Sequence, residues 1–97
     1  MVQAIENWAD LSGSVREIRP HSGAPQMSEL VLAVERADDV EGFPNAFAET
    51  PGSELPIAVE TGRLEQAGIS RGDRVRVRVE RASPRTVVAH PEGLAKG

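Results

Sequence analysis

Alternation of apolar and polar residues is strongest near the C-terminal end of the chain. Val75, Val77 and Val79 occupy every second position, and arginines and a glutamate fill the positions between and after them. β-Branched residues at this spacing favour a strand whose valine side packs inward while its charged side stays in water. Residues 81–85 then suit a turn, and the apolar stretch 86–90 predicts a second strand that ends at the next proline.

Two further elements precede this pair of strands. The alternating residues 55–60 predict a strand, and Pro56 within it cannot donate a ladder hydrogen bond, so we expect this strand to be short, irregular or at an edge. Residues 61–67 are typical of a short helix. Thr61 is available as its N-terminal cap, and Gly68 can end it in the left-handed conformation.

The N-terminal third of the chain contains two more strand patterns. Residues 29–36 predict a strand with alternate apolar side chains inward, and residues 11–18 predict another that passes through a bulge. Gly13, inside the latter, indicates a close backbone approach or a sharp bend. Residues 19–28 indicate a loop, and residues 38–53, which contain Gly, Pro and acidic residues, indicate a long irregular connection.

The predicted fold class is all-β with one short helix, in the order of three strands, the helix and two strands. This is the order of the OB-fold, a five-stranded Greek-key barrel that closes on itself. From residue 11 to residue 90 the chain resembles small bacterial OB-fold proteins, through LSGSV at 11–15 and AGISRGD at 67–73. A fainter resemblance, to primosomal replication protein N and single-strand-binding relatives, rests on the same Leu-Ser-Gly-x-Val motif and on SGAP at 22–25. The resemblance implies the fold more than any activity.

Length and composition predict one domain. A chain of 97 residues, 39% apolar and 27% charged, has room for a single core. We expect one OB-like domain over residues 1–97, with its core from about 8 to 91 and a flexible C-terminal tail over 92–97. The absence of cysteine excludes disulfides, thiolate metal sites and a catalytic cysteine. The longest apolar run is five residues and no export signal is recognisable, so we expect a cytoplasmic protein without a membrane contact.

Few residues could support catalysis or metal binding. The two histidines, His21 and His90, lie in a predicted loop and at a predicted strand end, and neither has a nearby serine in an elbow-type nucleophile motif, so we expect both to be solvated. The acidic residues at 38–41 lack the alternating oxygen ligands of a calcium loop and indicate an acidic turn. The sequence therefore predicts a non-catalytic protein with no cofactor, no metal site and no small-molecule substrate.

Charge is divided unevenly along the chain. The net charge of −4 conceals −8 over residues 1–62 and +4 over residues 63–97. Basic residues on the fourth strand and in the two loops expected to flank an OB ligand surface are candidates for binding single-stranded DNA or RNA. Against this, the expected strands carry no aromatic side chain for base stacking, and Glu29 and Glu35 lie on the second strand. The alternative is that the arginines pair across strands with Glu17 or Glu80. The nucleic-acid candidates are Arg19, His21, Arg76, Arg78, Arg81 and Arg85.

The irregular segment 41–47 holds two of the three aromatic residues. Exposed rings there would be anchors for a protein partner or for a second copy of the chain, because aromatic residues are enriched at binding hot spots. The alternative is that they fold back and plug one end of the barrel, and we expect Trp8 to pack on a barrel end as an N-terminal latch. The partner-binding candidates are Phe43, Asn45, Phe47, Arg74, Arg76 and Arg78. We therefore expect a protein-interaction or assembly module, with single-stranded nucleic-acid binding as the alternative.

Overall fold

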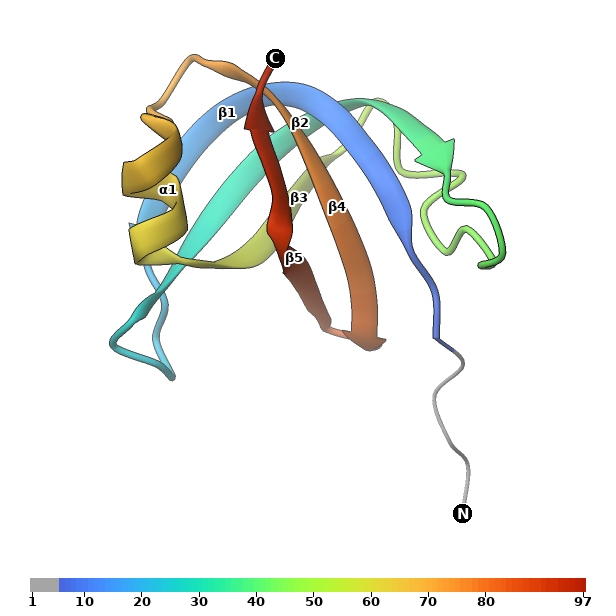
Figure 1. Cartoon of the computed structure of the whole chain (residues 1–97), viewed down its shortest axis with the longest axis horizontal. Coiled ribbons are helices and arrows are strands. Elements are labelled where there is room, and N and C mark those ends of the chain that lie inside the picture. The colour runs from blue at the N-terminus through green and yellow to red at the C-terminus, as the bar shows by residue number, and fades with distance from the viewer. Residues whose placement is uncertain (1–5) are drawn as a thin grey trace.

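Five strands and one short helix make up the computed structural model, which describes residues 6–97 (Figure 1). Their order is the predicted one, and the chain is all-β apart from the helix. Several strands extend beyond the predicted bounds. The elements are β1 (Ala9–Pro20), β2 (Met27–Asp39), β3 (Glu54–Glu60), α1 (Thr61–Ala67), β4 (Arg74–Ser83) and β5 (Thr86–Lys96).

The strands form one closed sheet in the order β1-β2-β3-β5-β4, with β4 returning to pair with β1. Neighbouring strands are antiparallel except β3 and β5, which run parallel and share one residue pair, Ala58 with Val88. The long β1 pairs with both β2 and β4 and curves over the top of the view in Figure 1. Two register shifts in its ladder with β2 accompany this curvature: Glu35 is an extra residue on β2, and Arg16 is an extra residue on β1.

Alternate residues of all five strands line the core, as the periodicity predicted. Each buried residue is followed by an exposed or half-buried one along most of β4, which is the expected pattern for a sheet with one face in water. Leu64 and Ile69 add apolar surface from the helix and the turn after it. The buried apolar residues of the strands, all in the core cluster except Val31, are Ala9, Leu11, Val15, Leu30, Val31, Leu32, Val34, Ile57, Val59, Val75, Val77, Val79 and Val87.

Gly13 lies where β1 presses against β2, so the predicted close backbone approach is confirmed. A Cβ atom at this position would lie 2.0 Å from the carbonyl oxygen of Ala33, well inside van der Waals contact. Glycine is therefore required because a side chain would overlap the neighbouring backbone. Its φ is not in the left-handed region, so backbone conformation is not the reason. Pro56 also behaves as predicted: it pairs with Val31 of β2, whereas the pairing of β3 with β5 is confined to residue 58.

Helix α1 ends as predicted but begins differently. Gly68 closes it with φ of 66°, and its N–H bonds back to the carbonyl of Glu65. The prediction that Thr61 caps the helix is wrong, because Glu60 occupies the N-cap position and Thr61 is the first helical residue. The Thr61 hydroxyl lies 2.8 Å from that of Ser28 and so ties the helix start to β2.

The prediction of a flexible tail over residues 92–97 is also wrong. Strand β5 continues through Pro91 to Lys96, where Ala95 pairs with Arg76. Residues 90–93 leave the ladder opposite Arg78, so the proline lies where no ladder hydrogen bond is needed, and pairing resumes after it. The Lys96 ammonium then lies 3.4 Å from the Asp73 carboxylate, which fixes the end of the strand.

Candidate functional site

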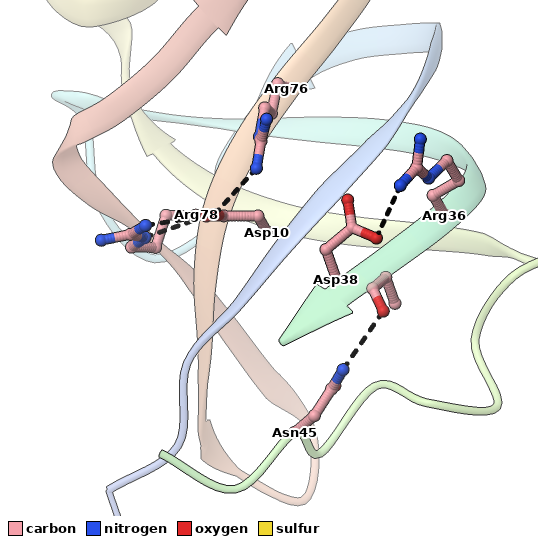
Figure 2. A network of polar contacts seen from close by, with 7 residues as sticks. Asp10, Arg36, Asp38, Asn45, Arg76 and Arg78 are labelled. Carbon is pink, nitrogen blue, oxygen red and sulfur yellow. Dashed lines mark hydrogen bonds and ion pairs between the residues drawn. The ribbon is translucent and has the colours of Figure 1, made fainter. Parts of the chain in front are cut away.

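Three alternate residues of β4 point to the outer face of the sheet and form what we call the arginine row: Arg74, Arg76 and Arg78. Carboxylates on neighbouring strands pair with these arginines. Asp10 of β1 lies opposite Arg78 in the ladder. The Nε and Nη2 atoms of Arg78 donate to the two carboxylate oxygens of Asp10 at 2.9 and 3.1 Å, and Nη2 of Arg76 reaches the second oxygen at 3.2 Å (Figure 2). One carboxylate therefore serves two guanidinium groups.

Burial and charge set the electrostatics of this cluster. The Asp10 side chain is 12% exposed, whereas those of Arg76 and Arg78 are 59% and 44% exposed. Hydrogen bonding from Arg78, helped by the charges of both arginines, lowers the pKa of the Asp10 carboxyl below its ordinary value. The Asp10 carboxylate therefore stays ionised, and the two arginine side chains that bind it remain about half exposed.

The charge of Arg74 is balanced by Glu35 of β2, a strand separated from β4 by β1. Its guanidinium crosses over the small residues at 12–14 and pairs with both carboxylate oxygens of Glu35, the Nη1 contact being 2.9 Å. This hydrogen bonding lowers the pKa of Glu35. Arg36 and Asp38 form a further ion pair of 3.0 Å on β2 (Figure 2). The row is thus ion-paired, as the alternative interpretation held, but the partners are Asp10 and Glu35, and the expected partners Glu17 and Glu80 are wrong.

The other nucleic-acid candidates are mostly engaged within the fold, and Arg19 and Arg81 lie on β1 and β4, not in the loops expected for them. Nε of Arg19 donates to Glu29 at 2.5 Å, and its Nη1 lies 3.4 Å from Glu17. His21 is half-buried, and its Nδ1 accepts the Gly23 N–H at 3.1 Å. Arg81 donates to the carbonyl of Pro84 at 3.1 Å, and its guanidinium carbon lies 5.2 Å from the centre of the Phe47 ring. Arg85 is exposed at the turn between β4 and β5.

The connection after β2 folds back on the sheet. Nδ2 of Asn45 donates to the carbonyl of Ala37 at 3.2 Å and to Asp39 at 2.9 Å, and its side-chain oxygen accepts the Phe47 N–H at 2.8 Å. These bonds place Phe47 in the core, where it is completely buried. The expectation of an exposed ring is therefore wrong for Phe47, which plugs the sheet instead, and Asn45 has a structural role. Phe43, in contrast, is 38% exposed.

An aromatic hollow of about 240 Å³ lies beside Phe43. Trp8 and His90 form its wall as an edge-to-face pair with ring centroids 5.4 Å apart. Trp8 thus packs on His90 of β5, and its Nε1 donates to Glu6 at 2.9 Å. His90 is half-buried against Trp8, and its Nδ1 accepts the Glu92 N–H at 3.0 Å. The lining residues are Glu6, Trp8, Val40, Phe43, Arg78 and His90.

A second hollow, of about 440 Å³, adjoins the first and shares Arg78 and His90 with it. We call this the charged hollow. The unpaired stretch 90–93 of β5 forms one wall, and a Cβ on Gly93 would lie 2.6 Å from the Cβ of Arg78. Glycine at this position therefore allows β5 to approach Arg78 of β4 closely. The lining residues are Asp10, Arg76, Arg78, His90, Glu92, Gly93 and Ala95.

Sequence reasoning identified part of this site. Phe43, Arg76 and Arg78 were candidates, and the structure places them around adjoining hollows. His90 and Asp10 were missed as site residues. No local signal marks them, because Asp10 is brought to the site by the pairing of β1 with β4, and His90 by the stretch of β5 that leaves the ladder opposite Arg78. Arg19, His21, Arg81 and Arg85 do not line either hollow.

Within residues 6–97 no group of three or more His, Asp or Glu side chains gathers so that it could hold a metal ion. The one helix described there lacks the length and apolar character needed to cross a membrane. The chain matches none of the protein-family models and none of the curated proteins with which it was compared.

Proposed function

We propose that this chain is a non-catalytic binding module with an OB-fold and that its ligand is a protein. The closed sheet in the order β1-β2-β3-β5-β4, with one helix between β3 and β4, supports the OB-fold. Function does not follow from the fold, so the proposal depends on the side chains of the two hollows.

The observation that carries the proposal is an exposed aromatic surface beside arginines that are held in place by ion pairs within the sheet. Arg74, Arg76 and Arg78 are ion-paired with carboxylates of the same sheet, whereas Phe43 is the exposed large apolar residue of the described chain. Phe43 lies beside Trp8, and Arg78 borders the same hollow. Aromatic residues and arginine are the types most enriched at protein-binding hot spots.

Single-stranded nucleic acid is the second candidate. The rings of Trp8 and Phe43 next to Arg78 could stack a base and contact a phosphate, which favours this function. Two observations oppose it: Glu6 lines the aromatic hollow, and Glu92 lines the larger hollow that adjoins it. Carboxylates along the path of a polyanion repel it, so a protein ligand fits the surface better.

Selection from a displayed random-peptide library tests the proposal. We expect the wild-type protein to enrich a family of related peptides and Phe43→Ser to fail to do so. Arg71→Ser, which changes an exposed turn residue away from both hollows, is the matched control and should enrich the same peptides. Native mass spectrometry of the wild type and Phe43→Ser covers self-association: a dimer lost in the variant would identify the partner as a second copy.

Fluorescence anisotropy with labelled single-stranded DNA and RNA tests the alternative of nucleic-acid binding. Nucleic-acid binding would be saturable and would weaken steeply between low salt and 0.2 M salt as counterions are released. If such binding occurs, is lost in Phe43→Ser, and the library gives no enrichment, the protein-ligand proposal is wrong.

A further inference from the structure

We infer that the two adjoining hollows together bind a peptide segment in which one large apolar side chain lies next to one carboxylate. The apolar side chain would occupy the aromatic hollow, and the carboxylate would bind Arg76 and Arg78. This inference rests on the proposed function, because it names the chemistry of the protein ligand at the same site.

The N–H donors of Arg76 and Arg78 that Asp10 does not use define the position for the ligand carboxylate. Asp10 engages Nε and one Nη2 hydrogen of Arg78, and one Nη2 hydrogen of Arg76. A guanidinium has five N–H donors, so most of those on the pair are not used by Asp10. Because Asp10 lies beneath the arginines and they are about half exposed, an incoming carboxylate meets two positive groups before it meets the buried negative one. A second carboxylate would give two acids for two guanidinium groups.

The size of the aromatic hollow limits what occupies it. Its volume of about 240 Å³ lies below the roughly 300–1,000 Å³ typical of pockets for small molecules and cofactors. It is the smaller of the two hollows, and we expect a single side chain to occupy it, held between Phe43 and the Trp8–His90 pair. Since both hollows share Arg78 and His90, the apolar group and the carboxylate must be close neighbours on the ligand.

The outer rim limits the number of acidic groups. Glu92 lines the charged hollow and Glu6 lines the aromatic one. Counting Asp10, Arg76 and Arg78 with them, the formal charge of the combined lining is −1. Attraction for an acid is therefore local to the guanidinium pair, and a run of acidic groups or phosphates would face repulsion at both ends.

Arg76→Gln is the variant that tests the inference. It removes the weaker of the two arginine contacts with Asp10 and leaves the two-bond contact from Arg78, so we expect the fold to be retained. Arg74→Gln is the matched control, because Arg74 lies on the same strand and face and is also ion-paired but lines neither hollow. Thermal melting of both variants checks that they remain folded.

The readout is the sequence preference of displayed random peptides selected by each protein. Wild type and Arg74→Gln should enrich peptides with Asp or Glu within two positions of a large apolar residue, and Arg76→Gln should keep the apolar preference and lose the acidic one. For one enriched peptide, synthesised with its acid as Asn, we expect binding to the wild type to weaken by roughly fivefold to tenfold. The Asn form and the acid form should bind Arg76→Gln about equally.

Several outcomes would overturn the inference. Enrichment of apolar peptides without an acidic preference, or of basic peptides, would refute the carboxylate position while leaving the proposed function intact. Equal loss of selection in Arg74→Gln and Arg76→Gln would show a general effect of the arginine row and would also refute it. The absence of any enrichment by the wild type would remove the proposed function itself.

Discussion

Replacing Phe47 by alanine should destabilise the protein more than any other single change in the connection between β2 and β3. The ring is completely buried and is the largest of the fully buried side chains. Truncation of a buried Phe to Ala costs about 3–5 kcal/mol in other cores, and the Arg81 guanidinium above the ring would lose its aromatic contact as well. A domain of this length has only about 5–15 kcal/mol of stability, so at least a fifth of it would be lost.

Urea unfolding followed by the fluorescence of Trp8, the one tryptophan of the chain, measures this loss. We expect a lower midpoint with an unchanged slope, and a fall in melting temperature of at least about 12 °C, since 1 kcal/mol corresponds to about 4–8 °C at this size. Phe43→Ala is the matched control, because it removes the same ring from an exposed position of the same segment and should cost under about 1 kcal/mol.

The comparison between the two phenylalanines can refute the reasoning. If Phe47→Ala costs less than about 1 kcal/mol, or no more than Phe43→Ala, the ring does not plug the sheet. An intermediate loss in Phe47→Leu, which keeps most of the apolar volume, would support the packing explanation.

Three other predictions concern the sheet. Gly13→Ala should unfold the protein or lower its midpoint severely, because the added methyl would overlap the Ala33 carbonyl; a midpoint within error of the wild type by circular dichroism would be inconsistent with the close approach. The contribution of Asp10 and Asp73 to the free energy of unfolding should be fully present above about pH 4. It should be lost as the pH falls through their lowered folded-state pKa values, because the unfolded chain binds these protons more readily. Urea midpoints from pH 7 to pH 2 measure this, and Asp10→Asn should be less stable at pH 7 and less sensitive to acid. Deleting residues 92–97 should lower the urea midpoint substantially, since their pairing with β4 would be lost, whereas a mobile tail would be removed without effect.

The parts of the fold that sequence predicted are those encoded by short-range periodicity. Val75, Val77 and Val79 are buried because alternation depends only on the pleat of one strand. Gly13 was recognised because glycine within a strand needs a spatial reason, and Gly68 because a short helix needs an end. The predicted element order followed from these local signals alone.

The remaining features depend on contacts between residues far apart in sequence. Pro91 looked like the end of a strand, but the stretch around it leaves the ladder and β5 resumes beyond it. The partners of the arginine row were mispredicted because they depend on registers that no single strand contains: Asp10 meets Arg78 across β1 and β4, and the bulge at Glu35 brings it to Arg74. For the same reason His90 was not recognised as part of the site.

Closure of the sheet has a consequence for synthesis of the chain. Strand β5, the last to be made, lies between β3 and β4 in the sheet. Until it is available, those two strands each present an unpaired edge, and an unpaired edge is a template for pairing with another chain. The nascent protein is therefore most exposed to misassembly until β5 has emerged and paired, and helpers that shield unpaired strands during translation would matter most in that interval.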